Sequence, residues 1–297
     1  MIDWDKLRIF HAVAEAGSFT HAGDTLNLSQ SAVSRQISAL EESLNVPLFH
    51  RHARGLILTE QGELLYRTAH EVFAKLAMAE AQLTESKERP RGPLKVTATV
   101  ALGSTWLTPR MKEFLDLHPE VSVELVLDER ELDLGMREAD VAIRMMPPRQ
   151  PDLIQRHLMT VHINIYAAAS YVRRRGMPKA PEDLDGHALI VYGEDSRLPN
   201  PDLNWLLRLG KKGEQKRTPV LCVNNVYAIL KAVQSGIGIG ALPEFMIQGA
   251  TDLVRVLPDL EGPRIDTYFV YPEELRNSKR IQVFRDFLLT HVAKSQF

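Results

Sequence analysis

The sequence predicts a small helical N-terminal region and a larger α/β region, joined by one long helix. Three observations carry this prediction. Apolar residues recur at helical spacing through the first 44 residues, and a second helical pattern runs from Thr59 to about Lys87. From Leu94 onward, short apolar strand patterns alternate with helical patterns. The length of 297 residues also favours about two domains.

The composition excludes several classes of protein. Hydrophobic residues make up 44% and charged residues 25%, which is typical of globular proteins and not of disordered or collagen-like chains. The single cysteine, Cys222, excludes an internal disulfide and any paired-cysteine metal motif, and its apolar strand favours a core position. The N-terminus has no signal-peptide pattern, and the longest uncharged stretch, 157–172, is too short to span a membrane. We therefore expect a soluble, cytoplasmic protein with no membrane partner.

Three short helices open the chain, each with a side chain suited to cap its first turn. Left-handed or helix-stopping residues follow them, such as Gly17 and the Asn45-Val46-Pro47 segment. The expected helices, with their capping residues, are 4–16 (Asp3), 19–26 (Ser18) and 30–44 (Ser29).

The third helix has two contrasting faces. One is apolar, with Val33, Ile37, Leu40 and Leu44 at steps of four, three and four. The other is small and polar and suits entry into a DNA major groove, where Gln pairs with adenine edges and Arg with guanine. No acid lies between Asp24 and Glu41, although the net charge of the whole chain is -2. A helix pair of this kind serves equally well as a packing motif.

A short hairpin follows at 48–58, with a turn at Ala53-Arg54-Gly55. Its basic tip would lie near phosphates or the minor groove. His50 and His52 make a poor metal site because no Cys or carboxylate accompanies them, and we expect neither a metal nor a cofactor. The predicted DNA-binding residues are Ser29, Gln30, Ser31, Ser34, Arg35, Gln36, Arg51, His52 and Arg54.

The first sixty residues resemble the winged helix-turn-helix of LysR-type transcriptional regulators. The matching stretches are SFTxAGxxLNLSQSAVSRQI at 18–37, LE at 40–41, LFxRxxRG at 48–55 and LTExG at 58–62. Three positions depart from the family's pattern. Gly23 and Gln61 stand where alanine is usual, and Ser31 stands where proline is commonest. The resemblance implies double-stranded DNA as a partner and places the winged helix-turn-helix domain at 1–58.

The segment 59–89 is predicted to be a linker and dimerisation helix. Its apolar residues form a heptad seam, or alternatively a face packed on the N-terminal domain itself. They are Leu65, Ala69, Val72, Leu76, Ala79 and Leu83. A homodimer would hold two recognition helices about 34 Å apart, which suits a near-palindromic operator. The resemblance implies the same dimer, often assembled into a tetramer.

The segment 90–297 reads as an α/β domain with βαβ units and a parallel sheet. The expected strands are 94–98, 121–127, 140–144, 163–168, 188–192, 220–223 and 267–271, and the expected helices are 104–117, 129–138, 226–235 and 281–292. Ligands of such sheets bind beyond the carboxyl ends of the strands. The predicted effector-binding residues there are Thr99, Ser104, Thr105, Arg144 and Asn224.

Three of these five residues also have a plainer interpretation. Ser104 and Thr105 could simply cap a helix, and Arg144 could form a surface ion pair. As helix N-termini favour anions, the hydroxyl groups indicate an anionic ligand.

This half also resembles the LysR effector domain, which is similar to periplasmic solute-binding proteins. The resemblance rests on FLxxHP at 114–119, ADVAIR at 139–144, PxDL at 181–184 and GIGIxxLP at 236–243. It implies a first subdomain of about 94–163 and 267–297, a second of about 164–266, and a small organic effector, commonly anionic. One extra residue lies between Val100 and Pro109 relative to the family.

Two other functions are weighed against a ligand-responsive transcription regulator. The sequence has none of the G-x-S-x-G, H-E-x-x-H, P-loop or kinase motifs of an enzyme built on the C-terminal fold. A solute-binding protein for transport would need a signal peptide and no DNA-binding head. We therefore predict a regulator and not an enzyme.

Overall fold

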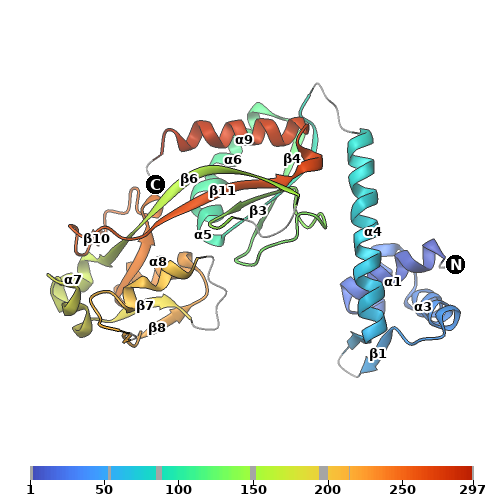
Figure 1. Ribbon diagram of the computed structural model, residues 1–297, viewed down its shortest axis with the longest axis horizontal. Coiled ribbons are helices and arrows are strands. Elements are labelled where there is room, and N and C mark those ends of the chain that lie inside the picture. Colours follow the sequence, from blue (N-terminus) through green and yellow to red (C-terminus); the bar gives the residue numbers. More distant parts are fainter. Residues whose placement is uncertain are drawn as a thin grey trace. The chain divides into compact units, whose positions relative to one another are not determined.

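The computed structural model describes residues 3–52, 55–84, 89–147, 152–193, 200–213 and 215–295. The chain divides into two compact units, Met1–Thr84 and Glu85–Phe297, each with its own core (Figure 1). In the ranges just given, no helix is both long enough and apolar enough to cross a membrane.

The N-terminal unit contains four helices and a hairpin. Its elements are α1 (Trp4–Ala16), α2 (Phe19–Leu26), α3 (Gln30–Leu44), β1 (Phe49–His52), β2 (Gly55–Leu58) and α4 (Glu60–Thr84). The bounds of the first three helices are those predicted from the sequence. Their expected N-caps, Asp3, Ser18 and Ser29, accept backbone N–H groups from the first turn of each helix. Local capping chemistry therefore explains where these helices begin.

The core of this unit lies where α1, α2 and α3 meet. Phe10, Val13, Val33, Ile37 and Leu40 have no exposed surface. A side chain at position 23 would meet the Leu28 carbonyl oxygen at 2.6 Å. The turn between α2 and α3 thus approaches α2 so closely that glycine fits and alanine does not, which accounts for the departure at Gly23.

The hairpin is anchored to α3 and α4 by two polar side chains. The Glu41 carboxylate accepts the backbone N–H groups of Leu48 at 2.7 Å and Phe49 at 3.3 Å. Thr59 donates to the Pro47 carbonyl at 2.8 Å and accepts the Gly62 N–H at 2.9 Å, as an N-cap of α4. The strands pair antiparallel from Phe49 with Leu58 to His52 with Gly55.

The C-terminal unit is built on a nine-stranded sheet. Its strands are β3 (Gly92–Ala98), β4 (Val121–Leu127), β5 (Val141–Arg144), β6 (Leu153–Ala168), β7 (Leu189–Tyr192), β8 (Leu221–Val223), β9 (Ile239–Pro243), β10 (Leu253–Arg255) and β11 (Arg264–Pro272). The order is β4-β3-β5-β11-β6-β9-β7-β8, with β10 also paired to β6. The long strand β6 belongs to both halves, as Figure 1 shows.

The sheet is mixed rather than wholly parallel. β3 pairs parallel with β4 and β5, and β7 pairs parallel with β8 and β9. β6 and β11 run antiparallel to their neighbours. The parallel strands in each half bring the polar residues that follow them to one edge.

Helices cover the two halves of the sheet. They are α5 (Val100–Leu102), the π-helical turn η1 (Gly103–Leu107), α6 (Met111–Leu117), α7 (Ala169–Arg175), α8 (Val226–Gln234) and α9 (Lys279–Val292). Short 3-10 turns are η2 (Thr108–Arg110), η3 (Pro181–Gly186), η4 (Pro201–Leu207), η5 (Glu244–Met246) and η6 (Glu273–Leu275). α9 contacts β3 and β6, and it packs on α6 through aromatic side chains, with the Phe114 and Phe284 rings 5.1 Å apart.

Three sequence predictions need correction. The segment 129–138 is not a helix but a loop. The Arg144 guanidinium donates to the backbone carbonyl oxygens of Asp128 at 2.9 Å and Arg130 at 2.8 Å. A side chain therefore engages these two carbonyl groups in place of the N–H groups of a helix. Cys222 is exposed, since the flanking Leu221 and Val223 face inward on strand β8 and alternation turns the cysteine outward.

The third correction concerns β6, which begins ten residues before the strand predicted at 163. Its first half contains polar residues and therefore shows no apolar strand pattern in the sequence. The helix expected at 104–117 also begins earlier, at Val100, and η1 lies within it. A π-helical turn holds one more residue than an α-helical turn. Such a turn would accommodate the extra residue that the resemblance implies between Val100 and Pro109.

Candidate nucleic-acid interface and ligand site

The polar face of α3 is exposed, whereas the opposite face is buried. Ser29, Gln30, Ser31, Arg35 and Gln36 are exposed. Ser34 is half-buried. On the opposite face of α3, Val33, Ile37 and Leu40 are fully buried. The core thus fixes the rotation of α3 and presents the predicted DNA-contacting residues together.

Arg35 is available to a partner molecule. It is exposed, and no other described residue forms a hydrogen bond or ion pair with its side chain. At the start of the helix, the Ser29 hydroxyl accepts the Ala32 N–H at 3.2 Å and lies 3.1 Å from the Ser31 hydroxyl. Ser29 therefore has a capping role in addition to the predicted DNA contact.

The basic hairpin residues are only partly covered by the structure. The backbones of Arg51 and His52 lie on β1, but their side chains are outside the described part of the chain. Arg54 lies wholly outside it. Their assignment to phosphate or minor-groove contacts stays a prediction.

The seam predicted on α4 divides into a packed part and an exposed part. Leu65 packs against the N-terminal core, and Ala69 is fully buried. Val72 and Leu76 are 36% and 49% exposed. The side chains of Ala79 and Leu83 are outside the description. The first stretch of the seam is thus packed on the N-terminal domain, and the dimer contact of the exposed stretch stays a prediction.

The five predicted effector-binding residues lie beyond strand ends but differ in availability. The Thr99 hydroxyl is buried, with no hydrogen-bond partner among the described residues. Thr105 donates to the Ala101 carbonyl at 2.8 Å, whereas Ser104 is half-buried and Asn224 exposed. The neighbouring Asn225 caps α8 by accepting the Ala228 N–H at 2.8 Å.

Arg144 holds the loop that follows β4. Its guanidinium donates to the Thr97 hydroxyl at 2.7 Å and to the two loop carbonyls already named. The residue is 8% exposed, and burial lowers its pKa while nearby acids oppose that shift. Arg144 is therefore a positioning residue in this structure.

Two residues that the sequence did not single out complete this region. One Glu129 carboxylate oxygen accepts the Val100 N–H at the start of α5 at 3.2 Å, and the other is buried with no partner among the described residues. The Tyr192 hydroxyl, at the end of β7, is also buried. Burial and the Glu129 charge raise the pKa of Tyr192, and a hydrogen bond with the Val226 backbone at the start of α8 opposes that shift.

We call Thr99, Glu129, Arg144 and Tyr192 the strand-end cluster. The contact between α5 and α8 brings the ends of the two half-sheets together at this place. Burial raises the pKa of Glu129, opposed by the Val100 N–H and by Arg144. Two buried oxygen atoms of this region, the Thr99 hydroxyl and one Glu129 carboxylate oxygen, have no partner among the described residues, which indicates a place where a polar molecule can bind.

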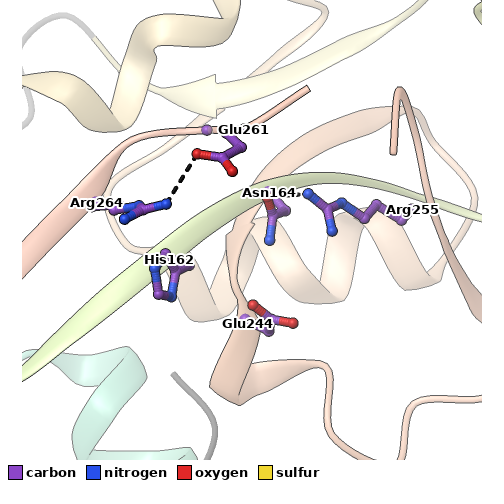
Figure 2. A pocket seen from close by; sticks show the side chains of 7 residues that line it. His162, Asn164, Glu244, Arg255, Glu261 and Arg264 are labelled. Carbon is purple, nitrogen blue, oxygen red and sulfur yellow. Dashed lines mark hydrogen bonds and ion pairs between the residues drawn. The ribbon is translucent and has the colours of Figure 1, made fainter. Parts of the chain in front are cut away.

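A small hollow lies where β6, β10 and β11 converge (Figure 2). It measures about 210 Å³ and is lined by His162, Asn164, Glu244, Arg255, Glu261, Gly262 and Arg264. Arg255 donates to the Asn164 side chain at 2.9 Å, and Arg264 pairs with Glu261 at 3.0 Å. Ligand sites typically measure at least about 300 Å³. This hollow is therefore small for a ligand site.

Two family models match the chain. The model of a bacterial regulatory helix-turn-helix protein of the lysR family matches residues 4–63, and that of a LysR substrate binding domain matches 87–293. The chain belongs to the LysR family of transcriptional regulators. LysR regulators bind DNA and small-molecule effectors and form oligomers.

Similarity to individual LysR relatives extends over nearly the whole chain. An HTH-type transcriptional regulator of Xanthomonas campestris pv. campestris is 30% identical, over 98% of this chain and 86% of the relative. The structure of CrgA, a LysR-type regulator from Neisseria meningitidis, matches with a TM-score of 0.63 at 27% identity, over 98% and 99% of the two chains. AphB, a virulence activator of Vibrio cholerae, matches with a TM-score of 0.63 at 27% identity, over 97% and 99%. These relatives are transcriptional regulators, and the winged helix-turn-helix and α/β fold predicted from the sequence is confirmed.

Proposed function

We propose that this chain reads a near-palindromic operator as a homodimer, with α3 of each subunit in the major groove. The observation that carries the proposal is the exposed Arg35, which has no partner among the described residues and lies among small polar side chains on a helix whose opposite face is buried. In such a setting Arg reads guanine, Gln reads adenine, and serines contact bases or phosphates. Arg51, His52 and Arg54 would contact the backbone or the minor groove.

The dimer is proposed to form through α4. The exposed Val72 and Leu76 extend the seam beyond the part covered by the N-terminal core. Burying such residues against a second copy removes apolar surface from water. A tetramer of two dimers is the further assembly that the family suggests, and sedimentation distinguishes the two states.

We further propose that a small polar metabolite binds at the strand-end cluster and changes the activity of the regulator. The sequence indicated an anionic ligand at this helix start. Glu129 supports a different chemistry, because its carboxylate already occupies the Val100 N–H there. Two like charges at one helix N-terminus repel each other, so a neutral or cationic molecule with hydrogen-bond donors suits the site better.

Operator binding is tested by incubating the purified full-length chain with fragmented genomic DNA and sequencing what it retains. We expect a small set of enriched fragments that share a near-palindrome and are released by added salt. Retention of no fragment, or of all fragments equally, would contradict the proposal.

Ligand binding is tested by a thermal-shift screen of metabolites on the full chain, because a ligand that binds only the folded state raises its melting temperature. Tyr192→Phe should reduce the rise in melting temperature that a bound metabolite produces. Glu244→Gln, in the hollow between β6, β10 and β11, should leave that rise unchanged. The opposite pattern would move the ligand site to the hollow shown in Figure 2.

A further inference from the structure

Two histidines and one glutamate meet where α1 packs against α4. His11 and Glu15 lie one turn apart on α1, and His70 lies on α4. The His70 Nδ1 atom is 2.9 Å from His11 Nε2 and 3.9 Å from a Glu15 carboxylate oxygen. The three residues can each offer one ligand atom such that all three atoms lie within 4.8 Å of one another.

Aromatic rings hold both imidazoles in place. Tyr66 lies 5.4 Å from the His11 ring and 5.6 Å from the His70 ring, between ring centres, and Phe73 lies 5.0 Å from His11. The two histidine side chains are 14% and 21% exposed, and that of Glu15 is 51% exposed. The aromatic rings thus pack against one side of the two imidazoles, and solvent can reach the ligand atoms from the side of Glu15.

This donor set is one that zinc uses. Two imidazole nitrogens and a carboxylate oxygen leave a fourth position for water, and each nitrogen lies about 2.0–2.1 Å from the ion. In a tetrahedral site two such nitrogens are about 3.3 Å apart. The two nitrogens would therefore have to separate by a few tenths of an ångström, and the rings would have to tilt so that both lone pairs point at the ion. Metal binding would replace the present contact between the two ring nitrogens.

Charge also fits a cation. Burial lowers the pKa of His11, opposed by Glu15 and reinforced by His70, which favours the neutral ring that a metal requires. The Glu15 carboxylate supplies a negative charge beside both rings. The cluster thus offers two imidazole nitrogen ligands and one carboxylate oxygen ligand.

We propose that His11, Glu15 and His70 form a binding site for a divalent transition-metal ion of the Zn²⁺ type. The ion would bridge α1, which packs on the recognition helix α3, to the helix proposed to carry the dimer seam. Because metal binding stabilises only the state in which both helices are docked, the ion would fix the DNA-binding head on α4.

The test uses the full-length chain without an affinity tag, stripped of metal with a chelator and then titrated with Zn²⁺ by calorimetry. Glu15→Gln and His70→Gln remove a ligand each, and His21→Gln removes an exposed histidine of the same domain as a matched control. Because the Glu15 side chain is half exposed, its substitution leaves the core intact. Circular dichroism without metal checks the fold of each variant.

We expect one Zn²⁺ per chain, at least tenfold weaker binding in Glu15→Gln and His70→Gln, and unchanged binding in His21→Gln. Visible absorption of bound Co²⁺ should likewise appear in the wild type and in His21→Gln only. Failure of Zn²⁺ to bind, or equal binding by the wild type and the folded Glu15→Gln chain, would overturn the proposal. In that case the cluster is a hydrogen-bonded histidine pair and nothing more.

Discussion

The exposed face of α3 and the strand-end cluster are both proposed binding surfaces, but they are built in opposite ways. On α3 the polar groups are exposed, and Arg35 has no partner among the described residues. In the strand-end cluster the polar groups are buried, and Arg144 and Glu129 are already engaged by backbone groups. A surface for DNA needs side chains free to meet a large partner, whereas a site for a small molecule needs groups held in advance. The predictions below test this contrast.

The largest effect is expected from the two faces of α3 itself. Ile37→Ala should lower the free energy of unfolding of the N-terminal unit by about 2–5 kcal/mol, because it leaves a cavity in a fully buried position. Gln36→Ala, its exposed neighbour, should leave stability within about 0.5 kcal/mol. Urea unfolding followed by circular dichroism measures both. Equal losses would mean that α3 is not oriented as described.

A smaller effect is expected where α4 leaves the core. Leu76→Glu should convert the dimer to a monomer in sedimentation velocity, because a charge replaces an exposed apolar residue of the seam. Operator affinity should fall at least tenfold as the two half-sites are no longer bound together. Lys75→Glu is the matched control, because Lys75 is also exposed and the substitution changes the charge outside the seam. A dimer that survives Leu76→Glu would remove this stretch from the interface.

The smallest effect concerns pH and the strand-end cluster. Since burial raises the pKa of Glu129, the folded chain resists ionisation, and stability should fall as pH rises from the ordinary glutamate value to the raised one. Glu129→Gln should remove this part of the decline, and the exposed Glu120→Gln should not. The midpoints of urea unfolding, measured at several pH values between the ordinary and the raised pKa of Glu129, show how stability changes with pH. Parallel curves for the wild type and Glu129→Gln would contradict the assignment.

Local sequence signals predicted the N-terminal unit well. Caps and 3.6-residue periodicity depend on residues a few positions apart, so the bounds of α1, α2 and α3 follow from the chain itself. Long-range contacts decided what the sequence could not show. Arg144 contacts a loop 14 and 16 residues away, and the segment expected as a helix is a loop.

The same reason explains which site residues were missed. Glu129 and Tyr192 lie 63 positions apart, and His11 and His70 lie 59 positions apart, so no motif links them. Thr99 and Arg144 could be proposed from the sequence because strand ends are visible in it. The role of Arg144 as a positioning residue depended on its burial, which only the fold reveals.

The central claim is that Arg35 on α3 reads base sequence. Fluorescence-anisotropy titrations at one fixed salt concentration should compare Arg35→Ala with Arg8→Ala, an exposed arginine on α1, on an enriched operator and on random DNA. We expect Arg35→Ala to weaken operator binding by about 1–3 kcal/mol and random DNA far less, while Arg8→Ala leaves the ratio unchanged. An equal loss on both DNAs for Arg35→Ala would contradict the claim.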